Sequence, residues 1–318
     1  MLSDTLNATS QYEQDAFVEM FRKDASWIDA TGLDWDRSWQ HLEKRLAEGA
    51  LGDMNFHGFL GPEHLTRLYN WIDRIPYPNF LNGPPFERLV ALARAADLAV
   101  MDRLGLDPEL HGIDAVSVYN AQDFRFQTPY QVPWRQRVRT FLDFGAGHGR
   151  QANLWLQTAP QLTTFIAVDA FPATYLTQRL YYQALGLTLN DHMDMTQQPF
   201  VIHEDPKVVN HLPSWRLDLV PDGSVDMVCA VQVLRELSRG MLRFALRQFH
   251  RILRTDGALY IRDHIGFHNV NMVDMDRVLA ASGFVAEWQP ALIDGKDVHG
   301  VPRIWRKPNL NAIIGGKV

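Results

Sequence analysis

The chain has 318 residues, of which 46% are hydrophobic and 21% are charged, and this composition is typical of a folded globular protein. A formal net charge of -6, a pI near 6.0 and the lack of any Lys/Arg block give no basic footprint for duplex DNA or an anionic membrane. The single cysteine excludes a disulfide within the chain, and neither a signal peptide nor an apolar stretch of membrane-spanning length is found. We therefore expect a cytoplasmic protein that acts on a small molecule, with no nucleic-acid or membrane partner, and a homodimer is left open.

Residues 1–135 are predicted to form a helical region. The clearest helix is "FERLVALARAADLAVMDRLG", which begins after Pro84-Pro85 and ends at Gly105. Its apolar residues follow helical spacing at Leu89, Leu92, Ala93, Ala96, Val100 and Leu104. A shorter segment, "HLTRLYNWIDRI", has the same pattern. Because an amphipathic helix must pack on something, we expect this region to cover the rest of the protein as a lid that recognises the substrate.

Residues 136–318 have a different pattern, in which short apolar runs alternate with helical segments, as in a parallel sheet covered on both faces. The predicted strands are "RTFLDF", "TTFIAVDA", "KVVNHL", "VDMVCAV" and "ALYIRDH". The helices among and after them are "QANLWLQ", "ATYLTQRLYYQALG", "GMLRFALRQFHRILRTDG" and "NMVDMDRVLAASG". At the end, "FVAEWQPALI" and "VPRIWRK" flank the turn "DGKD", which predicts an antiparallel hairpin.

A glycine-rich loop, Gly145-Ala146-Gly147-His148-Gly149, follows the strand "TFLDF" and leads into a helix. This is where the backbone of an open α/β sheet approaches its ligand. A dinucleotide fingerprint would require a third glycine at position 150, which is Arg150. Asp143, two residues before the first glycine, would repel a pyrophosphate but suits an ammonium group. The loop therefore favours S-adenosylmethionine over NAD.

This stretch resembles motif I of the class I S-adenosylmethionine-dependent methyltransferases. Further segments resemble the same family in the same order, namely "PDGSVDMVCAVQVLREL", "LRQFHRILRTDGALYI" and "LAASGFVAEW", so the resemblance covers about residues 138–307. It implies a doubly wound, seven-stranded, Rossmann-like α/β sheet with a C-terminal antiparallel hairpin, placed after the helical region. Residues 136–318 would then be the S-adenosylmethionine-binding core.

The resemblance also implies which residues hold the cofactor. In the family, the acid of the first strand and the glycine loop hold the amino-acid part, and an acid ending the second strand, here Asp169, takes the ribose hydroxyls. If "KVVNHL" is the third strand, Ser214 and Trp215 lie at the adenine edge, where Trp215 would stack on the base. His148 either touches the cofactor carboxylate or points to solvent. The full predicted set is Asp143, Gly145, Ala146, Gly147, His148, Gly149, Asp169, Ala170, Ser214, Trp215 and Val231.

Candidate bases lie at the ends of the fourth and fifth strands. The segment "IRDHIGFH" supplies Asp263, His264 and His268, and "QVLREL" supplies Glu236, where family members often carry an acid–histidine pair. His264 beside Asp263 is the preferred base, His268 the second choice, and Glu236 an orienting group. The alternative is that these residues only make hydrogen bonds in loops. Adjacent Asp and His on a strand point to opposite faces, and one cysteine gives no zinc pattern, so no metal is expected.

The substrate is expected to contact "SVYNAQDFRFQTPYQVPWRQR", which is rich in aromatic and amide side chains. These are Tyr119, Asn120, Gln122, Phe124, Phe126, Tyr130 and Trp134. They suit a polyhydroxylated or aromatic small molecule, and the alternative is simple core packing. The layout is similar to that of sugar O-methyltransferases and tailoring enzymes of secondary metabolism, and the histidines after the fifth strand favour O-methylation over N- or C-methylation, so we expect O-methylation of such a hydroxyl. Two alternatives stay open: a cyclase or pericyclase that binds the same cofactor without transferring methyl, and a non-catalytic cofactor-binding module.

Overall fold

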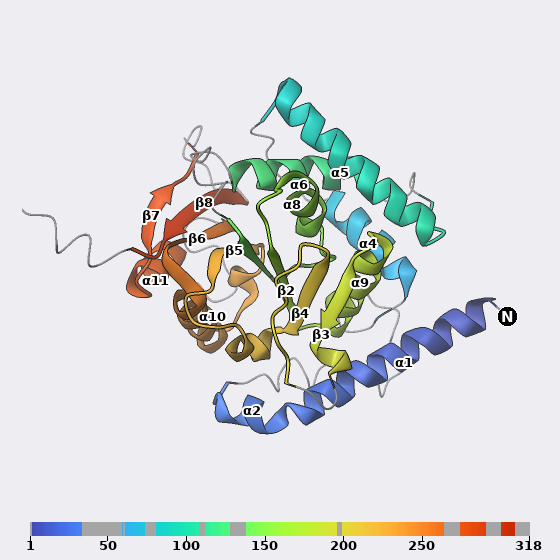
Figure 1. Ribbon diagram of the computed structural model, residues 1–318, viewed down its shortest axis with the longest axis horizontal. Coiled ribbons are helices and arrows are strands. Elements are labelled where there is room, and N and C mark those ends of the chain that lie inside the picture. The colour runs from blue at the N-terminus through green and yellow to red at the C-terminus, as the bar shows by residue number, and fades with distance from the viewer. Residues whose placement is uncertain are drawn as a thin grey trace, which may run out of the picture.

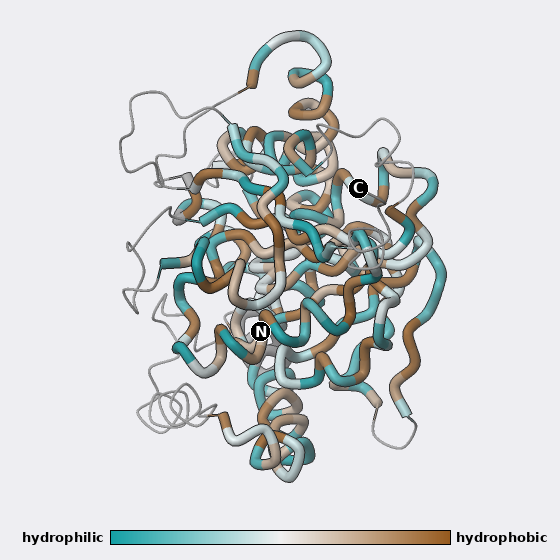
Figure 2. The backbone as a smooth tube through the Cα atoms, turned by 90° about the vertical axis from the view of Figure 1, so that its left-hand side faces the viewer, coloured by the Kyte–Doolittle hydropathy of each residue, from teal (hydrophilic) through white to brown (hydrophobic). Residues whose placement is uncertain are grey.

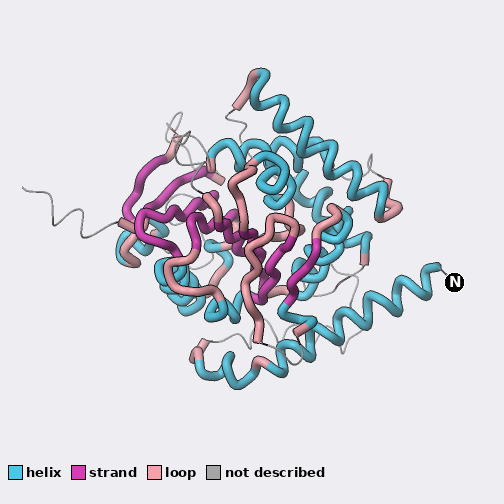
Figure 3. The backbone as a smooth tube through the Cα atoms, in the orientation of Figure 1, coloured by secondary structure: helices cyan, strands magenta, loops and turns pink. Residues whose placement is uncertain are grey.

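The computed structural model describes residues 2–33, 59, 61–73, 81–107, 112–127, 138–195, 199–263, 274–290 and 300–308. Over these residues the chain forms an α/β fold in which one twisted sheet is flanked by helices (Figures 1 and 3). The predicted division near residue 135 falls outside the described residues. No helix in the described segments combines the length and the apolarity needed to cross a lipid bilayer.

The sheet has eight strands in the order β3-β4-β2-β1-β5-β6-β8-β7. The strands are β1 (Thr140–Phe144), β2 (Thr164–Asp169), β3 (Thr188–Asp191), β4 (Val208–Pro213), β5 (Val225–Val231), β6 (Leu253–Asp263), β7 (Val285–Trp288) and β8 (Val301–Arg306). Strands β1 to β6 are parallel to one another, whereas β8 runs antiparallel to β6, and β7 antiparallel to β8. All five predicted parallel strands and the predicted C-terminal hairpin are therefore confirmed, while the turn "DGKD" lies outside the described residues.

The predicted number of seven strands is wrong by one. The missed strand is β3, "TLND", a short edge strand that is exposed at its start and has a polar end, so it has no apolar run to reveal it. As a result "KVVNHL" is the fourth strand along the chain, although it still pairs with β2.

Helices cover both faces of the sheet. One face carries α4 (Pro62–Asp73), α5 (Pro84–Arg103), α6 (Ile113–Phe126), α8 (Gln151–Thr158) and α9 (Pro172–Ala184), and the other carries α10 (Arg239–Ile252) and α11 (Met275–Ala281). Along β1, Phe141 joins the core of the first face, whereas Leu142 and Phe144 join that of the second. Hydrophobic and hydrophilic residues alternate along the helices, as expected of amphipathic helices that cover a sheet (Figure 2).

Helix α5 confirms the predicted segment, but its buried face is offset from the predicted one. Ala93 and Val100 are buried as expected, whereas the side chain of Leu92 is 38% exposed. Asp97 is instead buried on this face, where it accepts hydrogen bonds from Tyr181 Oη at 2.6 Å and Asn153 Nδ2 at 3.1 Å. The buried face of α5 thus includes a hydrogen-bonded acid, Asp97, and leaves out Leu92, which the apolar spacing had placed on it.

The N-terminal helix α1 (Leu2–Lys23) runs along one side of the molecule and contacts α9, and α2 (Ala25–Ala30) follows at its end (Figure 1). They meet the 3-10 segment Ser214–Leu219 that follows β4. Trp27 Nε1 donates to the carbonyl oxygen of Trp215 at 2.7 Å, and Trp215 Nε1 donates to Asp24 Oδ2 at 2.9 Å. These reciprocal bonds join the beginning of the chain to the carboxyl edge of the sheet.

Candidate active site

A cavity of about 260 Å³ opens at the carboxyl ends of the parallel strands. Its wall combines the loop after β1, the ends of β2 and β5, and residues of α1 and α6. Of the residues predicted to hold the cofactor, those that line this cavity are Asp143, Gly145, Ala146, Gly147, His148, Asp169, Ala170, Ser214, Trp215 and Val231. The structure thus gathers residues from four separate segments at one site, and their contact with a cofactor stays a prediction.

The three glycines of the loop have different roles. Gly147 has φ +61°, and a Cβ atom built there would meet nothing within 4 Å, so its backbone faces open space. A Cβ at Gly149 would lie 2.6 Å from Cε1 of Tyr182, and one at Gly145 would lie 2.5 Å from Cγ2 of Val233. Gly149 is not among the residues that line the cavity, and its lack of a side chain lets the loop pack closely against α9; its contact with the cofactor stays a prediction.

Asp143 is buried and lines the cavity, and its Oδ2 has no hydrogen-bond partner. Burial raises the pKa of this carboxyl to about 7, although the nearby Arg150 guanidinium acts in the opposite direction. An ammonium group in the cavity would supply the missing partner and stabilise the charged carboxylate. The side chain therefore fits the role that the sequence implied.

Asp169 joins the glycine loop to the start of α9. Its Oδ1 accepts from Ala170 N at 2.8 Å and from Thr174 Oγ1 at 2.7 Å, and its Oδ2 accepts from Gly147 N at 3.3 Å and from Gln178 Nε2 at 2.9 Å. These donors fix the carboxylate at the cavity wall, while burial raises its pKa. A ribose hydroxyl would meet an oriented acceptor there.

His148 packs between two tyrosine rings, with ring centroids 4.7 Å from Tyr69 and 5.5 Å from Tyr181. Burial lowers its pKa to about 3, so the imidazole is neutral at ordinary pH. The alternative that His148 points to solvent is wrong, because only 2% of the residue is exposed.

Trp215 forms the opposite part of the wall, and the N-terminal helix covers it. The ring centroids of Phe17 and Phe21 lie 5.9 Å and 5.0 Å from that of Trp215, both nearly perpendicular to it. All three side chains line the cavity. The contribution of α1 was not predicted at the level of residues, because the sequence shows no link between two segments almost 200 positions apart.

Two of the four candidate catalytic residues lie within the described part of the chain. Glu236 lines the cavity with its side chain 51% exposed; partial desolvation, together with the nearby Asp263 and Asp169 carboxylates, raises the pKa of its carboxyl to about 7. Asp263 is fully buried and is not among the residues that line the cavity. Its Oδ2 accepts from Arg235 N at 3.1 Å, which holds the turn that carries Glu236, and its part in the reaction stays a prediction. His264 and His268 lie outside the described residues. Within the described segments, no three His, Cys, Asp or Glu side chains are grouped as metal ligands would be.

The predicted substrate segment divides between the cavity and the core. Tyr119 of α6 lines the cavity, whereas Phe124 packs on Trp155 and Phe126 packs on Trp288. For these two phenylalanines the alternative of core packing is correct. Asn120 and Gln122 are buried as well, and Tyr130 and Trp134 lie outside the described residues.

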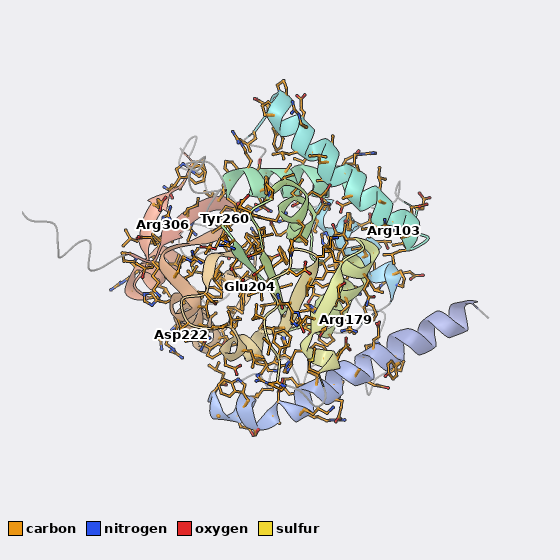
Figure 4. All side chains as sticks on the ribbon, viewed as in Figure 1. Arg103, Arg179, Glu204, Asp222, Tyr260 and Arg306 are labelled. Carbon is orange, nitrogen blue, oxygen red and sulfur yellow. The ribbon has the colours of Figure 1, made fainter. Side chains whose placement is uncertain are left out.

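A polar cluster on the α6 side of the site was not predicted. Asp123 of α6 is fully buried; it pairs with Arg150 through Oδ2, and its Oδ1 lies 3.2 Å from Arg262 Nη1. Tyr260 Oη, on β6 near α6 in Figure 4, donates to Oδ1 at 2.8 Å. Arg150 and Arg262 line the cavity. No sequence pattern joins these residues, because they come from three elements that meet only in the fold.

Comparison with known proteins relates part of this chain to methyltransferases. Residues 142–261 match the family model of a methyltransferase domain. No protein with curated function matches the chain. Similar solved structures include a candidate sarcosine dimethylglycine methyltransferase from Galdieria sulphuraria, with 11% identity over 62% of this chain and 88% of that one and a TM-score of 0.45. The CurJ carbon methyltransferase has 14% identity over 72% of each chain and a TM-score of 0.43. An arsenic(III) S-adenosylmethionine methyltransferase from Chlamydomonas reinhardtii has 14% identity over 54% of this chain and 63% of that one, with a TM-score of 0.36.

The family match begins in β1 and ends in β6, and it therefore contains both the glycine loop and Asp169. The wall built by these elements also fits the ligand that the loop predicts, with an unpartnered buried carboxylate oxygen at Asp143 and open space at Gly147. Residues 142–261 of the chain are thus similar to a methyltransferase domain, and they contain the glycine loop and the strand ends that build the cavity.

Proposed function

We propose that the protein methylates a hydroxyl group of a small molecule, a sugar-like compound or a secondary metabolite. The observation that carries this proposal is Glu236, a carboxyl in the cavity wall whose pKa is raised to about 7. A hydroxyl acceptor must lose its proton during transfer, and a general base works best when its pKa lies near the working pH. A carboxyl with an ordinary pKa would be a much weaker base.

Different residues of the cavity wall would bind different parts of the cofactor. Asp143 would hold the ammonium group, Asp169 the ribose hydroxyls, and the aromatic group of Phe21 and Trp215 the adenine, while Gly147 lets the backbone approach closely. When bound, the cofactor supplies an electrophilic methyl group on its sulfonium sulfur.

The remaining residues act on the acceptor and on water. Tyr119 and Gln151, on the same side of the cavity, offer a phenol and an amide that suit an acceptor with several hydroxyl groups. Glu236 takes the proton of the reacting hydroxyl on a carboxylate oxygen, and the bond from Arg235 N to Asp263 steadies its turn. Phe17 and Phe21 exclude water from above, which is the role expected of an N-terminal lid. His264 and His268 remain proposed as alternative bases.

The test measures whether a labelled methyl group is transferred from the cofactor to an acceptor. The protein is incubated with methyl-labelled S-adenosylmethionine and a metabolite extract, and labelled products are separated and identified. We expect label on a hydroxyl oxygen, and we expect Glu236→Gln to lower its transfer about a hundredfold while S-adenosylhomocysteine affinity stays within a few-fold. If Glu236→Gln keeps normal turnover and His264→Ala or His268→Ala does not, the base is a histidine. Label on nitrogen or carbon, or none at all, would refute O-methylation.

A further inference from the structure

A row of arginine side chains runs along the exposed face of α10. Arg243, Arg247 and Arg251 follow one another at intervals of four residues, so they lie on one face of the helix, with successive Cα atoms about 6 Å apart along its axis. Arg243 and Arg247 are exposed, and Arg251 is half-buried. None of the three lines the active-site cavity, so the row belongs to a separate surface.

The row forms one side of a groove between α10 and α11, which lie next to each other in Figure 1. Helix α11 contributes a fourth arginine, Arg277, which is also exposed. The other described residues of this arginine groove are His250, Val278, Ala281 and Ser282. Burial and the nearby Lys307 ammonium lower the pKa of His250, so its imidazole is neutral at neutral pH. Among the described lining residues, only the arginines are charged.

Only one of these four arginines is paired with a carboxylate in the described part of the chain. Asp222, in the turn before β5, pairs with Arg251. Helix α10 itself contains no acidic residue. On α11, Asp276 pairs with Arg303, and Asp274 caps the helix and interacts electrostatically with the same guanidinium. The carboxylates of both helices are therefore absent or directed to another cation.

This arrangement is unfavourable in the free protein. Like charges at i and i+4 of a helix repel each other and destabilise it. The groove also concentrates positive charge on a chain whose formal net charge is -6. A partner that brings negative charge would remove the repulsion, and the field of the groove would attract it to this face rather than to the rest of the surface.

We propose that the arginine groove binds an acidic helix of a partner protein. A helix with Asp or Glu at intervals of four residues presents carboxylates about 6 Å apart, which matches the spacing of the arginine row. Arginine binds a carboxylate through two parallel hydrogen bonds, so the contact has direction as well as charge. A helix also fits the shape of the site, because it can lie along the groove between two others.

Two other anionic partners fit the groove less well. Single-stranded nucleic acid stacks its bases on aromatic rings, and no Phe, Tyr or Trp is among the described residues that line the groove. Binding to a lipid surface combines basic residues with inserted apolar side chains, and none of the exposed large hydrophobic residues in the described segments lines the groove. A protein helix needs neither feature.

The experiment measures binding of a defined acidic helix. A fluorescein-labelled, alanine-based helical peptide with a row of glutamates at intervals of four residues is titrated with the protein, and its anisotropy is recorded at low and at physiological ionic strength. We expect the wild type to bind the peptide, and added salt to weaken binding. Arg243→Gln/Arg247→Gln should bind about tenfold more weakly. Its Tm should stay near that of the wild type, because both side chains are exposed.

Two controls separate a specific groove from general charge. Arg22→Gln/Arg88→Gln removes the same charge from exposed residues of α1 and α5 outside the groove, and it should bind the peptide like the wild type. A second peptide has the same composition, with its glutamates spread around the helix, and it should bind more weakly. An equal loss in the two double variants, or equal binding of the two peptides, would overturn the inference.

The other occupants are tested with the same variants. An oligothymidylate and phosphatidylserine-containing vesicles are titrated, and sedimentation velocity follows self-association of the protein. Tighter binding of either probe than of the acidic peptide, lost in Arg243→Gln/Arg247→Gln, would overturn the inference, as would self-association that this variant abolishes. No binding of the peptide at low ionic strength would also overturn it. The proposed function is unaffected by these outcomes, because the described residues of the groove and of the active-site cavity do not overlap.

Discussion

Replacing Gly147 by alanine separates the binding role of the glycine loop from its structural role. Gly147 has φ +61°, and a Cβ atom there would meet nothing within 4 Å, so the methyl group causes no clash in the free protein. The left-handed backbone alone costs about 1–2 kcal/mol for an alanine. With about 2.1 cal/mol/K of unfolding entropy per residue over 318 residues, this corresponds to a decrease in Tm of roughly 2–3 °C.

The ligand meets the new methyl group directly. Overpacking a closely fitted contact typically costs about 1–3 kcal/mol, so affinity for S-adenosylhomocysteine should fall about fivefold to 150-fold. The measurements are calorimetric titration and thermal melting monitored by circular dichroism. Gly105→Ala is the matched control, because Gly105 has φ +67° and equally open space but lies at the end of α5 outside the cavity wall.

Both variants should lose similar stability, and only Gly147→Ala should lose affinity. If Gly105→Ala weakens binding as much, or if Gly147→Ala binds normally, the close approach of a ligand to Gly147 is refuted. A Gly149→Ala variant should instead lose stability strongly, because its methyl group would overlap the Tyr182 ring.

Three further results are expected. Phe21→Ala should lower the free energy of unfolding by about 3 kcal/mol and weaken S-adenosylhomocysteine binding, because this ring packs on Trp215 in the cavity wall. The control is Tyr12→Ala on the same helix, which should change neither quantity because Tyr12 is 74% exposed. The rate of methyl transfer should rise with pH through about 7, because Glu236 must be deprotonated to act as the base, and a flat profile between pH 6 and 8 would contradict this role. Burial raises the pKa of Asp143 from 3.8 to about 7, so the stability that its neutral form provides is complete below pH 3.8 and is lost as pH rises through 7. Asp143→Asn should therefore lose less Tm between pH 5 and 8 than the wild type does, and identical losses would show that this carboxyl is not the titrating group.

The sequence was sufficient for elements whose signal is local. The five predicted parallel strands are short segments rich in apolar residues, and each occurs in the structure because a strand covered on both faces needs apolar side chains on both. The glycine loop was equally visible, since Gly147 and Asp143 lie four residues apart beside one strand. Helix α10 was predicted by its apolar face, and its Ser238 cap accepts from Met241 N at 3.2 Å.

Features that depend on distant segments required the tertiary structure. Strand β3 pairs through its backbone at the edge of the sheet, and four residues with a polar end carry no hydrophobic period that could identify it. Asp263 was expected at the rim of the site because it ends β6, but in the structure its carboxylate accepts a hydrogen bond from Arg235 N and the residue is not among those that line the cavity. Successive side chains of a strand point to opposite faces of the sheet, and the sequence does not say which of these side chains reach the ligand; tertiary packing decides it.

The site itself shows the same division. Spacing and the acid before the glycines were enough to predict a cofactor class, because these residues are neighbours in the chain and their chemistry can be interpreted together. The pairing of Arg150 with Asp123, and the cover that Phe21 places over Trp215, were decided only by the fold, since each pair joins residues whose separation in sequence carries no information about contact. Ion pairs and ring contacts form only between groups a few ångströms apart. Which groups come that close depends on how the helices pack on the sheet.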